Sequence, residues 1–159
     1  MPYLIDGHNL IGAHPAISLD DPEDELRLVQ ALQAFAGREG RSIWVYFDAA
    51  GPASPKSFRA GRVQARFVTP PRTADDAICE HLRRLGREAS NWTVVSSDQQ
   101  VSQTARQAGA RVLSSQEFIR RLAEADDEQP EEKPAANLTA EELETWQRLF
   151  RARDRDEGA

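Results

Sequence analysis

The chain has 159 residues, of which 40% are hydrophobic and 29% are charged, so it can bury one core and is long enough for one domain with an additional segment. Its formal net charge is −6, its single cysteine excludes an internal disulfide, and no apolar run approaches the roughly 20 residues of a membrane span. No signal-peptide pattern is recognisable, and together these features predict a cytoplasmic protein that makes no use of a membrane.

The first half of the chain alternates strand-like apolar runs with a helical pattern. Residues 42–47 are mostly β-branched or aromatic, which is typical of a strand covered on both faces. Residues 23–40 carry an apolar stripe at helical spacing, and Asp21 and Pro22 suit the N-cap and first position of that helix. The other expectations here are a short strand over residues 3–5, a loop over residues 49–61 and an edge strand over residues 63–69.

The second half continues this alternation. Thr73 and Asp76 have the spacing of a capping pair at the start of a helix over residues 73–88. The expected elements that follow are a buried strand over residues 92–95, a helix over residues 99–109 that ends at Gly109, a strand over residues 111–113, and a helix that opens with Ser114 and Glu117. Apolar strands that alternate with helices favour an α/β domain, doubly wound around a mainly parallel sheet.

The tail differs in charge from the rest of the chain. Residues 124–159 contain 12 acidic and 5 basic residues, whereas residues 1–123 contain 14 and 15, so the main domain is close to neutral. We expect a domain over residues 1–123, a disordered acidic linker with two prolines over residues 124–137, and an amphipathic helix over residues 138–153. Thr139 and Glu142 are placed to cap this tethered helix, which is expected to dock on the domain or on a protein partner.

Three of the predicted strands are followed closely by an aspartate: Asp6, Asp48 and Asp98. Parallel strands bring their carboxyl ends to one edge of the sheet, where open α/β folds bind ligands. Asp75 lies in the first turn of the helix over residues 73–88, on its core-facing side, and is expected to point into the same crevice. Asp76 is expected to cap that helix instead. The sequence therefore predicts one acidic site built from four carboxylates.

Carboxylates in one crevice repel one another unless a cation joins them or some of them are protonated. Mg²⁺ prefers oxygen ligands, and such an ion activates water for attack at phosphorus, so the pattern indicates hydrolysis of a phosphodiester. Any one of these acids could equally be a turn former or a helix cap. His8 is a candidate base or substrate contact. The remaining polar residues are given structural interpretations: capping and surface charge for Asp20, Asp21 and Asp24, and surface positions for His14 and His81. Cys79 is interpreted as a packing residue.

Residues 49–74 form the expected substrate arm, because this segment joins Asp48 to Asp75 and contains no acidic residue. Cationic side chains neutralise backbone phosphates, and aromatic rings such as Phe58 and Phe67 stack on unpaired bases. A solvated basic loop without a role is the alternative. The residues predicted to bind the nucleic acid are Lys56, Arg59, Arg62, Arg66 and Arg72.

Four motifs in order, LIDGHNLIG, VYFDA, the TAD of residues 73–75 and VVSSD, resemble the NYN-domain nucleases of the PIN-like superfamily, most closely the YacP-like group, over roughly residues 1–123. The resemblance implies a PIN-like three-layer α/β fold and an endoribonuclease that depends on Mg²⁺ or Mn²⁺. In the YacP-like group, it implies cleavage of messenger RNA in association with the ribosome. By position, it assigns the metal to Asp6, Asp75 and Asp98, places Asp48 and Asn9 in the catalytic pocket, and gives Ser97 a supporting role. Thr73, as a cap, and His8, as a residue near the site, are the other expected supporting residues.

The chain departs from this group at three places. The segment after Asp48 is rich in alanine, glycine and proline. His8 stands where the group often has tyrosine, and the tail from residue 124 onward shows no resemblance that transfers a role.

Two other functions compete with the nuclease. One is a non-catalytic RNA- or ribosome-binding module of the same fold. The other is a phospho-receiver domain, which needs a lysine at a strand end, whereas the two lysines here are Lys56 and Lys133.

Overall fold

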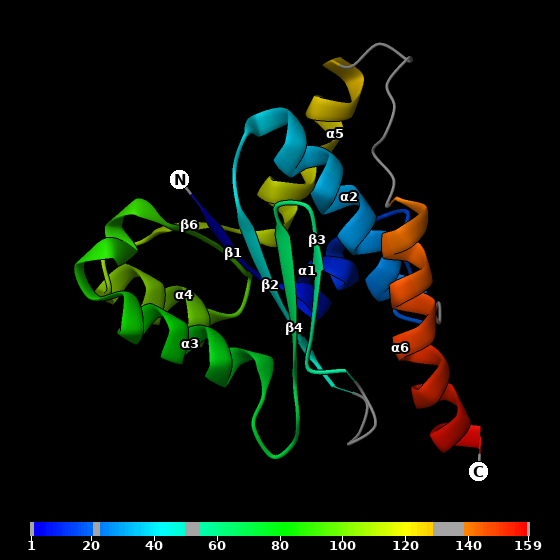
Figure 1. The fold of residues 1–159 in the computed structure, drawn as a ribbon. Helices are drawn as coiled ribbons and strands as arrows, with labels where there is room; N and C mark the ends of the chain where they lie inside the picture. The colour runs from blue at the N-terminus through cyan, green and yellow to red at the C-terminus, as the bar shows by residue number, and fades with distance from the viewer. Residues whose placement is uncertain (1, 21–22, 50–54, 129–138, 159) are drawn as a thin grey trace.

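The computed structural model describes residues 2–20, 23–49, 55–128 and 139–158, which form a three-layer α/β arrangement (Figure 1). Six strands form one sheet in the order β3-β4-β2-β1-β5-β6, in which β3 alone runs antiparallel to its neighbour. The strands are β1 (Tyr3–Asp6), β2 (Ile43–Asp48), β3 (Ser57–Ala60), β4 (Val63–Val68), β5 (Thr93–Val95) and β6 (Arg111–Leu113). The helices are α1 (Gly7–Ala13), α2 (Asp24–Glu39), α3 (Ala74–Leu85), α4 (Gln99–Gln107), α5 (Ser115–Glu128) and α6 (Ala140–Gly158), with a 3-10 helix η1 (Gly86–Asn91).

The sheet has a hydrophobic core on each of its faces, as its apolar strands predict. Ile43, Val45 and Phe47 of β2 contribute to the core shared with α2 and α5, whereas Tyr46 contributes to the core under α3 and α4. Burial on both faces explains why the central strands are nearly continuous apolar runs. The predicted α/β fold with a mainly parallel sheet is confirmed. Within the described residues, no helix is long and apolar enough to cross a membrane.

Several element boundaries differ from the sequence-based expectations. Residues Ser57–Ala60 form β3 inside the expected loop, because they pair with β4 and bury Phe58 and Ala60 on one face. Helix α3 ends at Leu85, since Gly86 takes a positive φ of 57°. Helix α5 continues to Glu128, five residues past the expected domain boundary at 123. The proposed cap of α2 at Asp21 and Pro22 and most of the expected linker lie outside the described residues.

The C-terminal helix α6 lies beside the β3–β4 hairpin and α2 (Figure 1). Thr139 and Glu142 form the predicted capping pair, and the second carboxylate oxygen of Glu142 accepts from the Gly61 N–H at 3.2 Å. The Trp146 ring centroid lies 4.8 Å from that of Phe58 and 6.2 Å from that of Phe67. These contacts bury Phe58 and Phe67, so the expectation that their rings stack on RNA bases is wrong.

Helix α1 begins directly after β1, over residues for which the sequence analysis predicted no helix or strand. Its first residue, Gly7, packs so closely on β2 that an added Cβ would lie 2.4 Å from the Phe47 ring and 2.9 Å from the Tyr46 carbonyl oxygen. Only a residue without a side chain allows this approach. Gly7 therefore sets how closely the helix that follows Asp6 packs against β2.

Replacing Gly7 with alanine is expected to destabilise the protein by about 1–3 kcal/mol, the range for overpacking a tight site. Gly37→Ala is the matched control, because Gly37 is also helical and a Cβ there meets no atom within 4 Å. That control should be neutral or stabilising by up to about 1 kcal/mol. Urea unfolding measures both, and equal stabilities of the two variants would contradict the close approach at Gly7.

Candidate active site

Four aspartates gather at the carboxyl edge of the sheet. Asp6 ends β1, Asp48 ends β2, Asp98 precedes α4 after β5, and Asp75 lies in the first turn of α3. Asp75 interacts electrostatically with each of the other three. Asp6 is 6% exposed, whereas Asp48 is open to solvent. The structure therefore brings together the four side chains that the sequence analysis assigned to one site.

Crowding changes the protonation of this cluster. Burial, followed by hydrogen bonding and charge repulsion from Asp75, raises the pKa of Asp6 from 3.8 to about 7. The pKa of Asp75 is also raised. Burial is the main cause, the hydrogen bond with Asp6 lowers this pKa, and the charges of Asp98, Asp48 and Asp76 raise it further. Without a cation, the Asp6–Asp75 pair therefore holds a proton near neutral pH.

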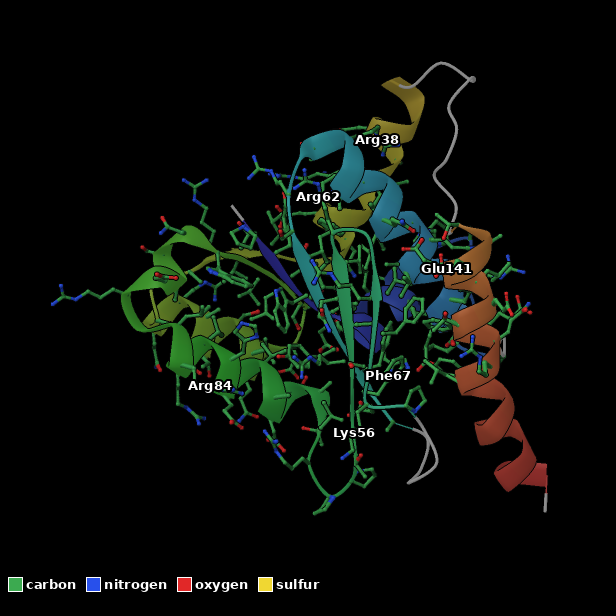
Figure 2. All side chains as sticks on the ribbon, in the orientation of Figure 1. Arg38, Lys56, Arg62, Phe67, Arg84 and Glu141 are labelled. Carbon is green, nitrogen blue, oxygen red and sulfur yellow. The ribbon has the colours of Figure 1, made fainter. Side chains whose placement is uncertain are left out.

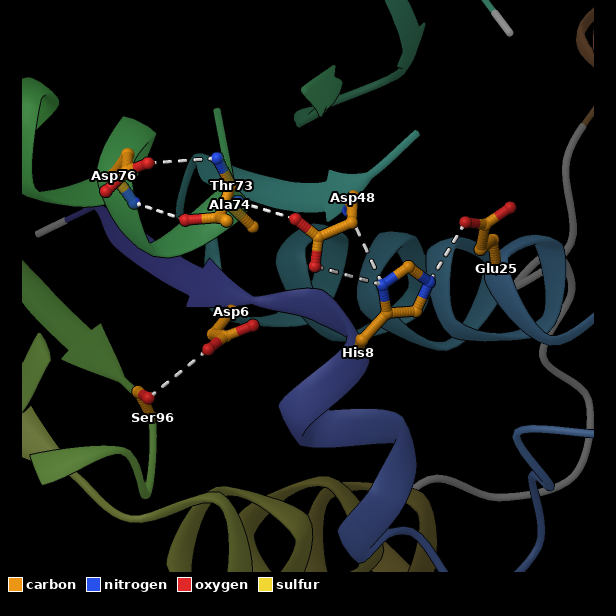
Figure 3. Close-up of polar contacts among 8 residues, drawn as sticks. All are labelled: Asp6, His8, Glu25, Asp48, Thr73, Ala74, Asp76 and Ser96. Carbon is orange, nitrogen blue, oxygen red and sulfur yellow. Dashed lines mark hydrogen bonds and ion pairs between the residues drawn. The ribbon is translucent and has the colours of Figure 1, made fainter. Parts of the chain in front are cut away.

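Asp48 and His8 form the outer part of the site (Figure 3). One Asp48 carboxylate oxygen accepts from the Ala74 N–H at 2.7 Å, which ties the end of β2 to the start of α3. The other lies 3.9 Å from His8 Nδ1, and His8 Nε2 lies 3.1 Å from Glu25 Oε2. Burial lowers the pKa of His8, but Glu25, Asp24 and Asp48 outweigh it and raise the pKa above its ordinary value.

Ser96 contacts both Asp6 and Asp98. Its hydroxyl lies 3.5 Å from Asp6 Oδ2 and accepts from the Asp98 N–H at 3.0 Å. The Asp98 side chain accepts from the Val101 N–H at 3.0 Å, so Asp98 is also the N-cap of α4. Asp98 thus has one oxygen committed to the helix, and the same hydrogen bond fixes the side chain at the edge of the site.

Asn9 is a positioning residue in this structure. Its side-chain oxygen accepts from the Ser97 N–H at 2.9 Å and from the Ser115 hydroxyl at 2.6 Å. The Ser97 hydroxyl donates to Gln116 and accepts from the Ser115 N–H. Asn9 and Ser97 therefore hold α1, the segment before Asp98 and the start of α5 together. Asn9 itself lies in helix α1.

Thr73 and Asp76 form the predicted capping box at the start of α3 (Figure 3). The Asp76 side chain accepts from the Thr73 N–H at 3.1 Å, and the Thr73 hydroxyl accepts from the Asp76 N–H at 3.1 Å. Asp76 is thereby occupied with the helix end, which leaves Asp75 as the acid of this turn that joins the cluster.

Four of the five basic residues of the predicted RNA-binding segment lie on or next to the β3–β4 hairpin, and Arg72 follows β4. Lys56 and Arg62 lie at opposite ends of the hairpin (Figure 2), and Lys56 is the one at the acidic edge. Arg72 also lies near that edge and pairs with Glu80. Arg66 stacks over Trp44 at 5.2 Å on the face away from α6, and Arg59 is exposed. Arg62 is therefore the member of the set farthest along the sheet from the carboxylates.

Several residues in and around the site differ from the sequence-based predictions. Asp24, expected at the surface, is buried, as is Glu25, the partner of His8. His81, also expected at the surface, is half-buried with Nδ1 2.9 Å from the Tyr46 hydroxyl and its ring packed against Trp44 and Trp92. Ser96 belongs to the VVSSD motif, but the family resemblance assigned a role only to its neighbour Ser97. The polarity of the SSD triplet in front of a helix was the one available hint.

Whether the cluster suits a cation depends on its donors. Among the described residues, no group of three or more His, Cys, Asp or Glu side chains forms a ready-made metal site. The donor set still fits a hard divalent ion, because all four groups are carboxylates and two have raised pKa values that a positive charge would lower. Mg²⁺ keeps several waters, so it does not require three direct protein ligands.

The mainly parallel sheet with carboxylates at its carboxyl edge places the chain among the α/β proteins that bind a ligand at that edge. A sequence model of the YacP-like NYN domain matches residues 3–151, so the chain belongs to the YacP-like NYN family. The match extends beyond residue 123, where the resemblance of the motifs ended. It therefore includes most of α6.

Two solved structures agree with this assignment. The crystal structure of Rae1 (YacP) from Bacillus subtilis is 26% identical, with a TM-score of 0.68 over 80% of this chain and 76% of that chain. The W164L mutant of the same protein is also 26% identical, with a TM-score of 0.67 over 79% and 77%. The comparison with curated proteins gave no match.

Proposed function

We propose that the protein is a divalent-metal-dependent endoribonuclease that hydrolyses phosphodiester bonds of single-stranded RNA. The observation that carries this proposal is the convergence of Asp6, Asp48, Asp75 and Asp98 at one edge of the sheet, where burial, followed by the neighbouring Asp75 and Asp48, raises the pKa of Asp6 to about 7. Membership of the YacP-like NYN family supports the RNA substrate. The messenger RNA engaged by a ribosome in the cytoplasm is the physiological substrate that we infer from the family resemblance.

Asp6, Asp75 and Asp98 would hold Mg²⁺ or Mn²⁺. When bound, the ion would lower the pKa of a water and stabilise charge on the scissile phosphate. Ser96 and the N-cap hydrogen bond orient Asp98, while the Ala74 N–H orients Asp48. His8 lies between Glu25 and Asp48, with a partner at each ring nitrogen, so it would position Asp48 at the outer side of the pocket.

The basic residues at the acidic edge would guide the RNA backbone, with Lys56 and Arg72 nearest to the site and Arg66 and Arg59 along the exposed face of the hairpin. Arg62 contributes least because of its distance. We also propose that α6 remains docked on β3 and β4 in solution rather than on a protein partner, since Trp146 and Phe150 are buried there.

A non-catalytic RNA- or ribosome-binding module is the second candidate. The absence of a ready-made metal site among the described residues favours it. The presence of four acids in one crevice favours the enzyme, because a binding surface for a polyanion gains nothing from carboxylates.

Cleavage of a mixed single-stranded RNA and of the matching DNA tests the proposal directly. The wild-type protein should cut the RNA with Mg²⁺ or Mn²⁺, fail to cut it in EDTA, and leave the DNA intact. Either metal should also raise the unfolding temperature of the wild type, because ligands that bind the folded state stabilise it. The proposal would be overturned if neither metal changed the unfolding temperature and the protein cut neither free RNA nor RNA on translating ribosomes. The function would then be that of the binding module.

A further inference from the structure

A polar groove of about 550 Å³ lies on the far side of Asp98 from the basic hairpin, between α4 and the segment that joins β6 to α5. Four side chains of α4 line it at the spacing i, i+3, i+4 and i+7: Gln99, Ser102, Gln103 and Arg106. Residues at this spacing share one face of a helix. In sequence they look like a solvated face, and tertiary packing is what turns them toward Val112 and Ser114.

The groove adjoins the acidic site through Ser96, although none of the four aspartates lines it. Ser96 and Ser97 line it, and the Ser96 hydroxyl contacts both Asp6 and the Asp98 N–H. Gln99 follows Asp98 directly in the chain. A polymer bound with one phosphate at the carboxylates would therefore reach the groove with its neighbouring nucleotide.

The lining carries the chemistry of nucleotide recognition. Its side chains are mostly amides and hydroxyls, and Val112 is the apolar contribution, whereas pockets for drug-like ligands are mainly apolar. Glutamine carboxamides present a donor and an acceptor side by side, which suits the edge of a base. The groove contains one acid, Glu117, whose carboxylate contacts the Ser114 hydroxyl at 3.1 Å and helps to cap α5.

Arg106 supplies the positive charge of the groove. It is exposed, it lines the groove, and it has no carboxylate partner within the described residues. The helix rises about 10 Å from Gln99 to Arg106 at about 1.5 Å per residue. That length spans a nucleotide together with the phosphate on its far side.

We propose that this groove binds one unpaired nucleotide of the RNA next to the scissile phosphate, with Gln99 and Gln103 on the base edge and Arg106 on the following phosphate. This site rests on the proposed nuclease function and deepens it, because it gives the RNA a second contact surface opposite the basic hairpin. It also gives the enzyme a means to prefer one base over another at a single position.

Affinity for RNA in a cleavage-inactive protein tests the groove. Asp75→Asn serves as the inactive background, since Asp75 does not line the groove. In this background with Mg²⁺, Arg106→Ala should weaken the binding of a short unstructured RNA about tenfold or more and reduce the slope of log K against log salt by about 0.7, as expected for one lost phosphate contact. Fluorescence anisotropy at several salt concentrations measures both quantities.

Arg111→Ala is the matched control, because Arg111 is an exposed arginine on β6 that lies outside the groove. It should leave affinity unchanged. Equal affinities of the Arg106 and Arg111 variants would overturn the site, provided that both unfold at the temperature of their background. For the base contact, Gln103→Ala in the active protein should flatten the base preference next to the cut, and Gln107→Ala, outside the groove, should not.

The groove and the nuclease activity can fail separately. Weakened RNA binding by Arg106→Ala, combined with a wild type that never cuts, would uphold the groove as an RNA site and overturn the nuclease. Cleavage by the wild type, combined with unchanged binding and base preference in the Arg106 and Gln103 variants, would uphold the nuclease and overturn the groove.

Discussion

Asp6→Asn is expected to lower the rate of metal-dependent RNA cleavage by more than about 100-fold. Loss of groups that merely support a metal ligand costs about 10–100-fold, so loss of a ligand itself should exceed that range. Asn preserves the size of the side chain and its contact with Ser96 but removes the charge that attracts the cation. Single-turnover cleavage with saturating Mg²⁺ or Mn²⁺ measures the effect.

Asp76→Asn is the matched control. Asp76 neighbours Asp75 but caps α3 through Thr73, so its replacement should leave the rate within a few-fold of the wild type and cost at most about 1 kcal/mol of stability. Asp75→Asn should behave like Asp6→Asn. If Asp75→Asn and Asp76→Asn were equally active, the assignment of the acids would be wrong.

The same Asp6→Asn change should stabilise the metal-free protein at and above neutral pH. The pKa of Asp6 is about 7 in the folded state against 3.8 for an ordinary aspartate, so the folded protein holds a proton that the unfolded chain has released. The free energy of unfolding of the wild type therefore falls as pH rises from about 4 to about 7. The variant should lose this dependence and gain at most about 4 kcal/mol at high pH.

Urea unfolding in EDTA across this pH range checks that linkage. The advantage of the variant should fade as the pH falls through about 4 and vanish at about pH 3, where Asp6 is mostly protonated in both the folded and the unfolded state. A variant that is less stable than the wild type at every pH would show that Asp6 is stabilised as a carboxylate, contrary to its burial beside Asp75. Activity and stability thus respond to one substitution in opposite directions, which a purely structural aspartate would not produce.

Trp146→Ala is expected to destabilise the protein by about 3–5 kcal/mol, the usual cost of truncating a buried tryptophan. The Trp146 side chain is 5% exposed and contacts Phe58, Phe67 and Phe150, with ring centroids 4.8, 6.2 and 4.3 Å away. Its loss would leave a cavity between α6 and the β3–β4 hairpin. The midpoint and slope of urea unfolding, followed by circular dichroism, measure the change.

Gln147→Ala, one position further on the exposed side of α6, should change stability by less than about 0.5 kcal/mol. If Trp146→Ala were as mild as this control, α6 would not be docked on the hairpin in solution. A docked α6 also predicts that Trp146→Ala weakens RNA binding indirectly, because Phe58 and Phe67 hold the strands that carry Lys56, Arg59 and Arg66.

Much of the site could be predicted from the chain, because it follows from two local rules. An aspartate after an apolar strand stays at the strand end in any parallel sheet, so Asp6, Asp48 and Asp98 converge once the topology is parallel. Asp75 and Asp76 have different roles because they lie on different sides of α3 and because Asp76 forms the capping box with Thr73. The expected loop over residues 49–61 was wrong at β3, because residues 57–60 pair with β4 across a tight turn and thereby bury Phe58 and Ala60.

The sequence by itself determined the α/β class, the four strand-end and helix-start acids and the caps at Thr73 and Thr139, since each depends on residues close together in the chain. Only the tertiary structure decided the direction of Asn9, the link through Ser96, the burial of Phe58 under Trp146 and the groove along α4. These features join residues from different elements, and a contact of that kind leaves no periodic signal in a single chain. Its partners are chosen by the packing of the whole core.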